Sequence, residues 1–538
     1  MARRLGALFV SLLLLLQPIS ALGPPQLAQK RWFHTQNQEA HRLRRREDVD
    51  PALLYPAYNL SVPIDHFHND TLYEPHSNGT FNLRYWFDAI NYKPGGPVVV
   101  LASGETSGVG RLPFLQKGIV SQLTQATNGL GVILEHRYYG TSIPNEDLED
   151  PYSTENLRFL TTDQALADTA YWMKNVKFEG IDADLTAPGT PYILYGGSYA
   201  GGFVAFMRKL YPDITWGAIS SSGVTEAIWD YWEYYSPHAE YGPPACISNT
   251  QDFTAIVDNI LIDESNSAYV QPLKEAFGIG NLTHNDDFAY VISWGIGGWQ
   301  GRNWDPEIND PSFDYYCNNI TSSELLYPEL KSSASNVSTL ISAGGGDTAL
   351  TTQFLNYIGY VNATVTGGCE YTDDQCFSFY NASLHTDSGQ ARSWPYQYCT
   401  QWGYLQTGSG VPAGQKPLIS RLIDLPYTSL PCSLGFNITT PPNITAINKY
   451  GGLEIRYPRL AFVDGEVDPW RPVGPHGKNA TDRISTASEP FVLIEDAVHH
   501  WDENGVFANE TTAERPPLAV RDAQALERMF VEAWLLGM

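Results

Sequence analysis

The sequence predicts an α/β fold in which a doubly wound, parallel sheet is interrupted by a large, mainly helical insertion. Short apolar runs rich in β-branched residues alternate with helical segments over residues 97–221, and the alternation resumes over residues 459–536. Between these parts, residues 225–431 are rich in aromatic residues and show helical stretches but no clear series of strands. Strands separated by helices favour parallel pairing, because a crossover helix returns the chain to the same edge of the sheet.

The elements follow in the order that such a sheet requires. Expected strands are apolar runs that end at glycine or polar residues, and expected helices are longer segments with helical spacing. Thr162 or Asp163 is the expected cap of one helix, and Tyr211-Pro212 ends the next. The strands are expected at residues 97–103, 131–134, 192–195, 217–221, 459–463 and 491–494, and the helices at 112–126, 163–177, 203–210, 253–262, 269–277, 350–360 and 517–536.

Composition limits the classes of function. The chain has 538 residues, of which 43% are hydrophobic, so it can bury a large core in two domains or in one domain with an insertion. It carries 33 Lys and Arg against 59 Asp and Glu, a net charge of −26 at pH 7. This excess of negative charge disfavours nucleic acids and anionic membrane surfaces as partners.

The N-terminus has the pattern of a secretory signal peptide over residues 1–22. Arg3 and Arg4 precede an apolar centre, and small residues follow near Ser20. A membrane anchor would need about 20 apolar residues, and Gln17-Pro18 interrupts the run too early. Residues 23–50, with the basic run 42–46, are expected to form either a solvated arm or a pro-segment that is cut after the arginines.

Cysteines and glycosylation sequons agree with secretion. The six cysteines are even in number, so three disulfides are expected in an oxidising compartment, with a local pair Cys369–Cys376. Many N-x-S/T sequons indicate a glycoprotein with these asparagines on the surface. The cysteines are Cys246, Cys317, Cys369, Cys376, Cys399 and Cys432, and the sequons start at Asn59, Asn69, Asn78, Asn281, Asn319, Asn336, Asn362, Asn381, Asn437, Asn443, Asn479 and Asn509.

Ser198 lies at a sharp turn between an expected strand and an expected helix, in the sequence Gly196-Gly197-Ser198-Tyr199-Ala200. Only small residues fit where a strand and a helix nearly touch, and this pattern is typical of a nucleophile elbow. Ala200 stands where the usual pattern has a second glycine. A simple Gly/Ser-rich turn is the alternative, and the flanking strand and helix favour the nucleophile.

A serine nucleophile needs a base and an acid that orients the base. The loop after residues 459–463 offers Asp464, Glu466 and Asp468, and the loop after residues 491–494 offers His499 and His500. The order serine, acid, histidine is that of this architecture, but the pattern does not choose within either group. Acidic residues in such a turn also serve simply to cap or solvate it.

Two backbone N–H groups are expected to form an oxyanion hole. One belongs to Tyr199, the residue after the nucleophile, and the other to Gly104 or Glu105 in the small-residue loop 103–108. A flexible surface turn is the alternative for this loop.

These residues carry a resemblance to the prolyl carboxypeptidase family of serine peptidases, which includes lysosomal prolyl carboxypeptidase, the lysosomal dipeptidyl peptidase and fungal acid prolyl endopeptidases. The resemblance covers most of the chain from about residue 58 onward. The motifs that carry it are Gly196-Gly197-Ser198-Tyr199-Ala200-Gly201, Glu135-His136-Arg137-Tyr138-Tyr139-Gly140, residues 156–168, Asp468-Pro469-Trp470 and Trp394-x-Tyr396-Gln397-x-Cys399-Thr400.

The resemblance implies an α/β-hydrolase fold with a helical cap, here residues 225–431 between hydrolase segments 51–224 and 432–538. It assigns Ser198 as nucleophile, Asp468 as acid and His499, three positions before Asp502, as base. Members of the family cleave beside proline or small residues in acidic conditions, without a metal or a cofactor. Two departures are Gln401, where relatives often carry a carboxylate, and Asp464, where they often carry asparagine.

The resulting hypothesis is a secreted serine exopeptidase, either a dipeptidyl-peptidase or a carboxypeptidase, that acts on proline-containing peptides at acidic pH. Trp470, Trp394 and Trp402 are candidates for the substrate pocket, although buried aromatics are more often ordinary core. The alternatives are a prolyl endopeptidase, an esterase and a non-catalytic binding protein. The expected partners are peptides or proteins, with homodimerisation left open, and a vacuolar or lysosomal location is the alternative to secretion.

Overall fold

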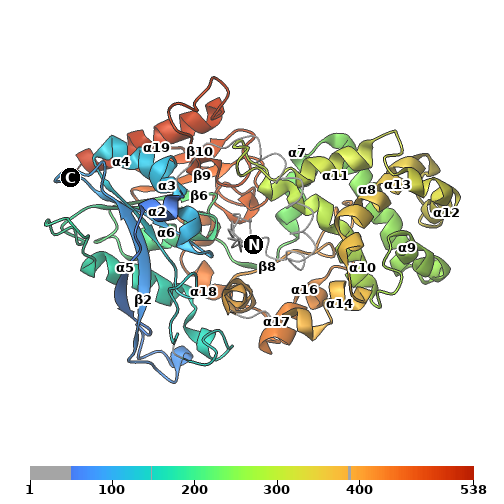
Figure 1. The fold of residues 1–538 in the computed structure, drawn as a ribbon, viewed down its shortest axis with the longest axis horizontal. Helices are drawn as coiled ribbons and strands as arrows, with labels where there is room; N and C mark the ends of the chain where they lie inside the picture. Colours follow the sequence, from blue (N-terminus) through green and yellow to red (C-terminus); the bar gives the residue numbers. More distant parts are fainter. Residues whose placement is uncertain (1–49, 147, 386–388, 538) are drawn as a thin grey trace, which may run out of the picture.

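The computed structural model describes residues 50–146, 148–385 and 389–537. The expected signal peptide and the arginine run 42–46 lie outside the described residues. The molecule has one part built around a sheet and a second part built of helices (Figure 1). Within the described residues, no helix combines the length and the apolarity that crossing a bilayer would require.

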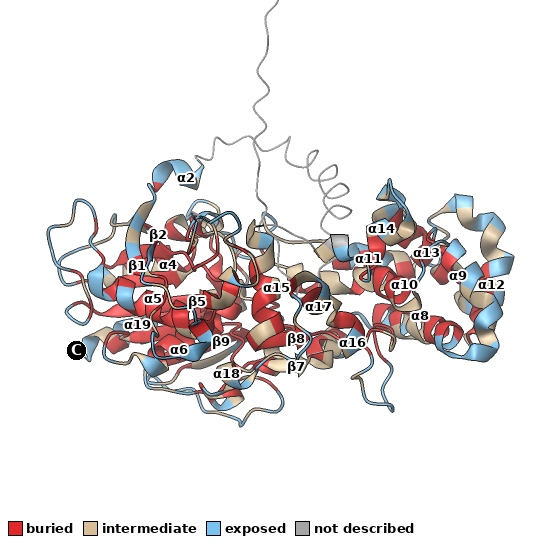
Figure 2. Ribbon diagram, turned by 90° about the horizontal axis from the view of Figure 1, so that it is seen from below, coloured by how far each residue is buried: buried red, intermediate tan, exposed pale blue. Residues whose placement is uncertain are grey.

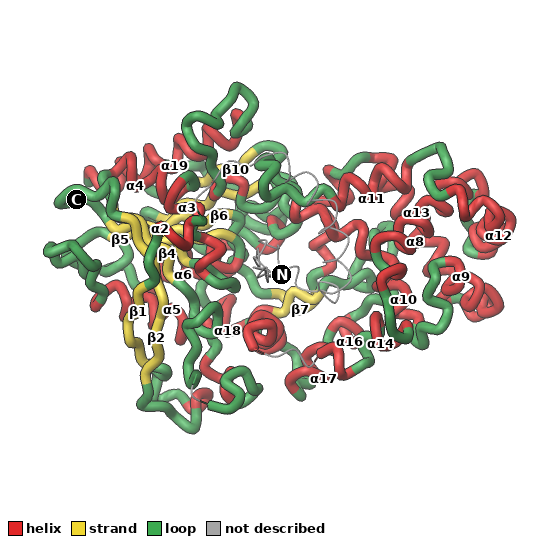
Figure 3. Tube along the Cα trace, viewed as in Figure 1, coloured by secondary structure: helices red, strands yellow, loops and turns green. Residues whose placement is uncertain are grey.

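A single eight-stranded sheet forms the centre of the first part, in the order β1-β2-β4-β3-β5-β6-β9-β10 (Figure 3). The strands from β4 to β10 in this order pair in parallel, whereas β2 pairs antiparallel with both β1 and β4. The strands are β1 Tyr58–Pro63, β2 Thr80–Asp88, β3 Val98–Ala102, β4 Leu130–Leu134, β5 Tyr192–Gly197, β6 Gly217–Ser221, β9 Leu460–Gly465 and β10 Phe491–Ile494.

The two antiparallel strands β1 and β2 were not predicted, whereas the six predicted strands do pair in parallel. A loop with only a short 3₁₀ turn, Thr71–Tyr73, joins β1 to β2, so no crossover helix forces parallel pairing. In β2, Phe81, Leu83 and Tyr85 are buried, while Asn82 between them is exposed. Alternation of buried and exposed residues is typical of an antiparallel strand. A search for continuous apolar runs, which are typical of parallel strands, does not detect it.

Helices cover both faces of the sheet, because successive residues of each strand point to opposite sides. Val98 and Val100 of β3 belong to a core shared with α5 (Thr162–Asn175) and α6 (Tyr199–Leu210). Val99 and Leu101 belong to a second core, shared with α4 and α19. The remaining helices of this part are α2 Pro51–Leu54, α3 Pro113–Gln116, α4 Ile119–Thr127 and α19 Leu518–Leu536. This layered arrangement, with Ser198 between β5 and α6, confirms the α/β-hydrolase class.

Several helix ends differ from the predictions. Thr161, not Thr162 or Asp163, caps α5, and its hydroxyl accepts a hydrogen bond from the Gln164 N–H at 3.3 Å. The helix expected at residues 112–126 is divided into α3 and α4 at Gly118, where a side chain would come within 2.7 Å of the Glu503 carbonyl oxygen. The helix after the elbow starts at Tyr199, four residues earlier than expected, because Ser198 itself is the N-cap residue of this helix.

Between β6 and β9 the chain is mainly helical, and most of these helices form the helical part, which has a hydrophobic core of its own. One short parallel pair, β7 Ile228–Asp230 with β8 Gly403–Leu405, lies where this part meets the sheet domain. Short 3₁₀ turns connect the helices, which are α7 Ser236–Tyr241, α8 Pro244–Ile262, α9 Val270–Ala276, α10 Asn285–Ile292, α11 Ser312–Thr321, α12 Ala334–Ala343, α13 Thr351–Thr364, α14 Asp373–Phe377, α15 Ser393–Gln397, α16 Leu425–Thr428, α17 Leu430–Phe436 and α18 Thr445–Asn448. Of these, the helices α15, α17 and α18 pack instead on the core of the sheet domain.

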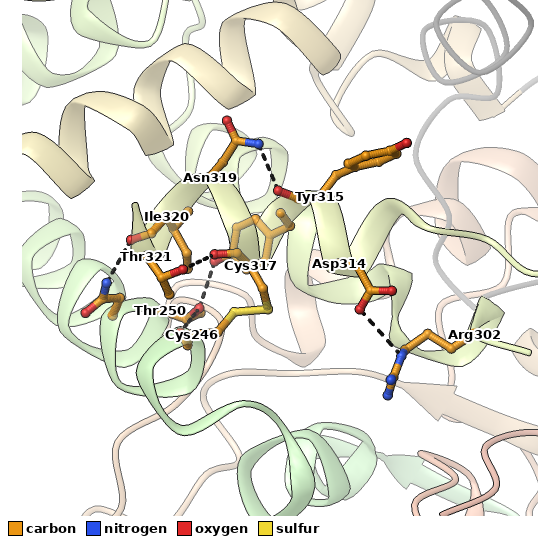
Figure 4. Close-up of a disulfide and its surroundings, with 11 residues drawn as sticks. Cys246, Thr250, Arg302, Asp314, Tyr315, Cys317, Asn319, Ile320 and Thr321 are labelled. Atoms are coloured by element: carbon orange, nitrogen blue, oxygen red, sulfur yellow. Dashed lines mark hydrogen bonds and ion pairs between the residues drawn. A yellow bond between two sulfur atoms is a disulfide. The ribbon is translucent and has the colours of Figure 1, made fainter. Parts of the chain in front are cut away.

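All six cysteines are paired, which confirms the predicted three disulfides and the local pair. The bonds are Cys246–Cys317, Cys369–Cys376 and Cys399–Cys432. The first joins α8 to α11 inside the helical part, beside the Thr250 side chain (Figure 4). None of the twelve sequon asparagines is buried, as a glycosylated surface requires. Figure 2 shows that the exposed parts of the ribbon lie mainly at its periphery.

Replacing Cys246 and Cys317 together by alanine is expected to lower the free energy of unfolding by about 4 kcal/mol, because the bond joins positions 71 residues apart. Replacing Cys369 and Cys376, only 7 residues apart, should cost about 2.5 kcal/mol. Urea denaturation of the two double variants measures both losses. Equal losses would contradict the loop-length account.

Candidate active site

The elbow between β5 and α6 holds Ser198 in an unusual backbone conformation, with φ 59° and ψ −126°. Such a conformation is strained for a residue with a side chain and persists only where its surroundings impose it. A side chain at Gly196 would collide with the Ala200 carbonyl group, and one at Gly201 would lie 2.7 Å from the Gly223 Cα. The close approaches therefore fall on Gly196 and Gly201, which explains why alanine is accepted at position 200.

The loop after β9 supplies a buried carboxylate, Asp468. Its Oδ2 lies 2.8 Å from Nδ1 of His499, and its Oδ1 accepts a hydrogen bond from the Trp470 N–H at 2.9 Å. The other two candidate acids are engaged elsewhere. Asp464 Oδ2 lies 2.6 Å from His476 Nδ1, and Glu466 accepts a hydrogen bond from the Asp496 N–H.

The two adjacent histidines have different environments. His499 is held by Asp468, and its Nε2 is buried without a hydrogen-bond partner among the described residues. Nδ1 of His500 instead lies 3.0 Å from Glu503 Oε2. The His500 ring faces Gly197, where an added Cβ would be 3.3 Å from its Cγ. The histidine loop therefore contacts the elbow one residue before Ser198.

The environments also shift the two imidazoles in opposite directions. Burial, opposed in part by the Asp468 carboxylate, lowers the pKa of His499 below its usual value of 6.5. Burial acts in the same direction on His500, but the Glu503 carboxylate outweighs it, and the pKa of His500 is raised. Of the two imidazoles, His499 is therefore the one that stays neutral to lower pH, which suits a candidate base.

The loop expected to complete the oxyanion hole packs against the elbow. Gly104 adopts φ +70°, and a Cβ added to it would be 3.3 Å from the Ala200 Cβ and 4.0 Å from Tyr199 Cδ1. This close approach places the backbone of Gly104 and Glu105 beside the first turn of α6, whose N-terminal N–H groups carry positive partial charge.

The Glu-His-Arg-Tyr-Tyr-Gly motif supports the residue that follows Ser198. Nε2 of His136 lies 2.9 Å from the Tyr199 hydroxyl, and its Nδ1 lies 2.8 Å from the Arg137 carbonyl oxygen. Because a carbonyl only accepts, Nδ1 carries the proton and Tyr199 donates to Nε2. Burial lowers the pKa of His136 to about 4, so the neutral ring persists in acid.

The three candidate pocket tryptophans lie in different places. Trp402 is fully buried and, like Trp394, packs edge-on against the Tyr199 ring, so both support the elbow. The Trp470 ring lies 6.5 Å from the His499 ring, and its Nε1 donates to Gln300 Oε1 of the helical part at 2.8 Å. Trp470 is therefore the candidate beside the base.

Gln401, the departure noted in the sequence, is buried and tied to α5. Its side-chain oxygen accepts hydrogen bonds from the Thr162 N–H at 3.0 Å and from the Thr162 hydroxyl at 3.3 Å. Its amide oxygen is thus committed to holding the start of this helix.

Two strand residues that the sequence analysis missed anchor the histidine loop. The Tyr195 hydroxyl donates to Asp502 Oδ2 and the Ser221 hydroxyl to Asp502 Oδ1, both at 2.6 Å. Asp502 thereby ties the loop to β5 and β6. Tyr195 and Ser221 belong to runs that the sequence analysis interpreted only as buried strands. Their partner Asp502 is distant in sequence, so no local pattern predicts these hydrogen bonds.

Residues 63–515 match the family model described as serine carboxypeptidase S28. A probable extracellular serine carboxypeptidase of Arthroderma benhamiae is 52% identical over 511 residues, covering 92% of this chain and 70% of that protein. Serine protease vicPb of Bipolaris victoriae is 28% identical over 82% of each chain. The human thymus-specific serine protease is 24% identical, over 85% of this chain and 83% of that protein.

Tyr199→Phe is expected to lower the free energy of unfolding by about 1–3 kcal/mol, because it leaves the buried His136 Nε2 without a donor. Tyr171→Phe, at an exposed position on α5, is the matched control and should change it by less than about 0.5 kcal/mol. Chemical denaturation compares the two. An equally small effect of both would show that the His136 contact does not stabilise the elbow.

Proposed function

The chain belongs to the serine carboxypeptidase S28 family and is a serine-type peptidase, and from this premise we propose that it is a secreted carboxypeptidase that cleaves proline-containing peptides in acidic surroundings through Ser198, His499 and Asp468. One observation carries the assignment. Asp468 Oδ2 lies 2.8 Å from Nδ1 of the buried His499, whose neighbour His500 faces the elbow at Gly197, and His499 Nε2 has no hydrogen-bond partner within the described residues.

The chemistry that this arrangement supports is acyl transfer. Ser198 Oγ attacks the scissile carbonyl carbon while His499 Nε2 accepts the hydroxyl proton, giving a tetrahedral intermediate. His499 then gives that proton to the leaving amine, the C–N bond breaks, and an acyl-enzyme remains. A water molecule, deprotonated by His499, hydrolyses the ester and restores Ser198.

The neighbouring residues have supporting roles. Asp468 holds the tautomer of His499 with the proton on Nδ1 and stabilises the imidazolium that forms. The Tyr199 N–H, with the N–H of Gly104 or Glu105, is proposed to donate to the oxyanion, and the packing of the Gly104 loop on the first turn of α6 supports this.

Recognition of proline is proposed for Trp470, which belongs to a buried aromatic cluster. Tyr231, Tyr234 and Tyr404 pack against this tryptophan, with ring centroids 5.1–5.4 Å away. All four rings are buried, so the tyrosines fix the position of the Trp470 ring, which we propose contacts the pyrrolidine ring. Because Trp470 also donates a hydrogen bond to Gln300, the helical part helps to hold this tryptophan in place.

Two further inferences rest on the relatives and on covalent features. The name of the Arthroderma benhamiae protein supports both carboxypeptidase action and an extracellular location. Three disulfides and accessible sequons agree with passage through a secretory pathway.

Peptides blocked at one end test the proposed cleavage mode. With proline in the penultimate position, an N-acetylated peptide should lose its C-terminal residue, and the same peptide with a C-terminal amide should resist, since carboxypeptidases require a free carboxylate. Mass spectrometry identifies the products. Release of an N-terminal dipeptide, cleavage within doubly blocked peptides, or hydrolysis of acyl esters alone would each overturn carboxypeptidase action and indicate a dipeptidyl-peptidase, an endopeptidase or an esterase.

Matched variants test the triad in the same assay. Ser198→Ala and His499→Ala should each lower kcat by about 10⁶-fold, because the triad acts as a unit. His500→Gln should lower it by at most about 100-fold, the size of a positioning effect. A larger loss from His500→Gln than from His499→Ala would reverse the assignment of the base.

The pH dependence follows from the direction of the His499 shift. Because burial lowers the pKa of His499, the neutral base persists below pH 6.5 and is lost only as the pH falls through the lowered pKa. The acid limb of kcat/KM should therefore have its midpoint below 6.5. A midpoint at or above 6.5, measured with a substrate that does not titrate in this range, would contradict this environment of the base.

A further inference from the structure

We propose that Asp65, His68 and His76 form a binding site for one divalent transition-metal ion of the zinc class, separate from the catalytic residues. The three lie on the segment that connects β1 to β2, at the antiparallel edge of the sheet. One ligand atom from each residue lies within 4.8 Å of the others. Within residues 50–146, 148–385 and 389–537, no other group of three potential ligands meets this criterion.

The Asp65 carboxylate is held in a fixed orientation. Its Oδ1 accepts hydrogen bonds from the Phe67 N–H and from Gln164 Nε2, both at 2.9 Å, and the side chain is almost completely buried. Its Oδ2 points to the histidines, 2.7 Å from His76 Nδ1. Outer hydrogen bonds that fix one oxygen and leave the other free are what a ligating carboxylate needs.

The two histidines complete a site that faces solvent. Their ring centroids are 5.5 Å apart, and His68 is exposed, so its ring can turn toward an ion without displacing core residues. An ion bound by Asp65 Oδ2 and His76 Nδ1 would replace the hydrogen bond between them, and the neutral His76 ring would carry its hydrogen on Nε2 instead. Water would occupy the fourth position of a tetrahedron.

The ligand set selects the class of ion. Imidazole nitrogen suits Zn²⁺, Cu²⁺ and Ni²⁺, whereas Mg²⁺ and Ca²⁺ favour sites made of oxygen ligands only. Two imidazoles with one carboxylate therefore favour zinc, which accepts mixed nitrogen and oxygen ligands at 2.0–2.2 Å.

The site would join the β1–β2 connection to α5. Gln164, which holds Asp65, also accepts a hydrogen bond from the His66 N–H at 2.9 Å. His66 Nε2 in turn lies 2.8 Å from Asp168, a second residue of α5. A bound ion would attach the exposed His68 to this hydrogen-bond network, so we expect it to raise the stability of the folded protein.

Zinc titration of the mature, glycosylated and tag-free protein, stripped of metal with a chelator, tests the proposal. Calorimetry should show one Zn²⁺ bound per chain at this site, and saturation should raise Tm, while Mg²⁺ should do neither. His68→Ala and His76→Ala should each raise the Kd for Zn²⁺ at least about tenfold. His284→Ala, a histidine of the helical part, is the matched control and should leave the Kd unchanged.

The exposed His68 keeps the test independent of folding, because its replacement should leave the metal-free Tm unaltered. Using the glycosylated protein matters, since Asn69 adjoins His68 and Asn78 lies two residues after His76. Absence of Zn²⁺ binding, or the same Kd in His68→Ala, His76→Ala and the parent protein, would overturn the proposal. Neither result bears on the peptidase activity, because the proposed metal site is separate from Ser198, His499 and Asp468.

Discussion

The backbone of Ser198 is the constraint on which the rest of the structure depends. Its positive φ is held because its N–H donates to the Ser221 carbonyl group of β6 and its own carbonyl accepts from Gly201 and Gly202 of α6. A strand and a helix can approach this closely only where side chains are missing. The hydrogen bonds to β6 and α6 maintain this close approach and hold the Ser198 side chain at the carboxyl edge of the sheet.

A buried ion pair, Arg137 with Asp168, lies next to His136, which contacts the elbow through Tyr199. The Arg137 guanidinium forms two 2.6 Å hydrogen bonds to Asp168 of α5 and also donates to the carbonyl groups of Ile64 and Phe159. A buried pair of charges is tolerated when its remaining hydrogen-bonding groups are also satisfied, as here. The pair locks α5, the start of the β1–β2 connection and the His136 loop into one arrangement, and so couples the edge of the sheet to the Tyr199 ring.

The helical part contributes through a few polar contacts at an aromatic junction. Gln300 accepts from both Trp470 Nε1 and the Tyr234 hydroxyl, at 2.8 and 2.9 Å. These bonds fix the tryptophan that lies beside the proposed base. The same junction therefore joins the helical part to the loop that carries Asp468.

The sequence by itself determined the α/β class, the large helical insertion, most strand positions and the elbow at Ser198, because these depend on local periodicity and on glycines at fixed spacing. It also limited the acid and the base to a few residues, and family resemblance pointed to Asp468 and His499. Only the tertiary structure showed that Asp468 contacts His499 while His500 pairs with Glu503. The tertiary structure also showed three further features: the antiparallel edge of the sheet, the hydrogen bonds of Asp502, and the cluster of Asp65, His68 and His76. Sequence patterns do not reveal them, because these contacts join residues that come together only when the chain folds.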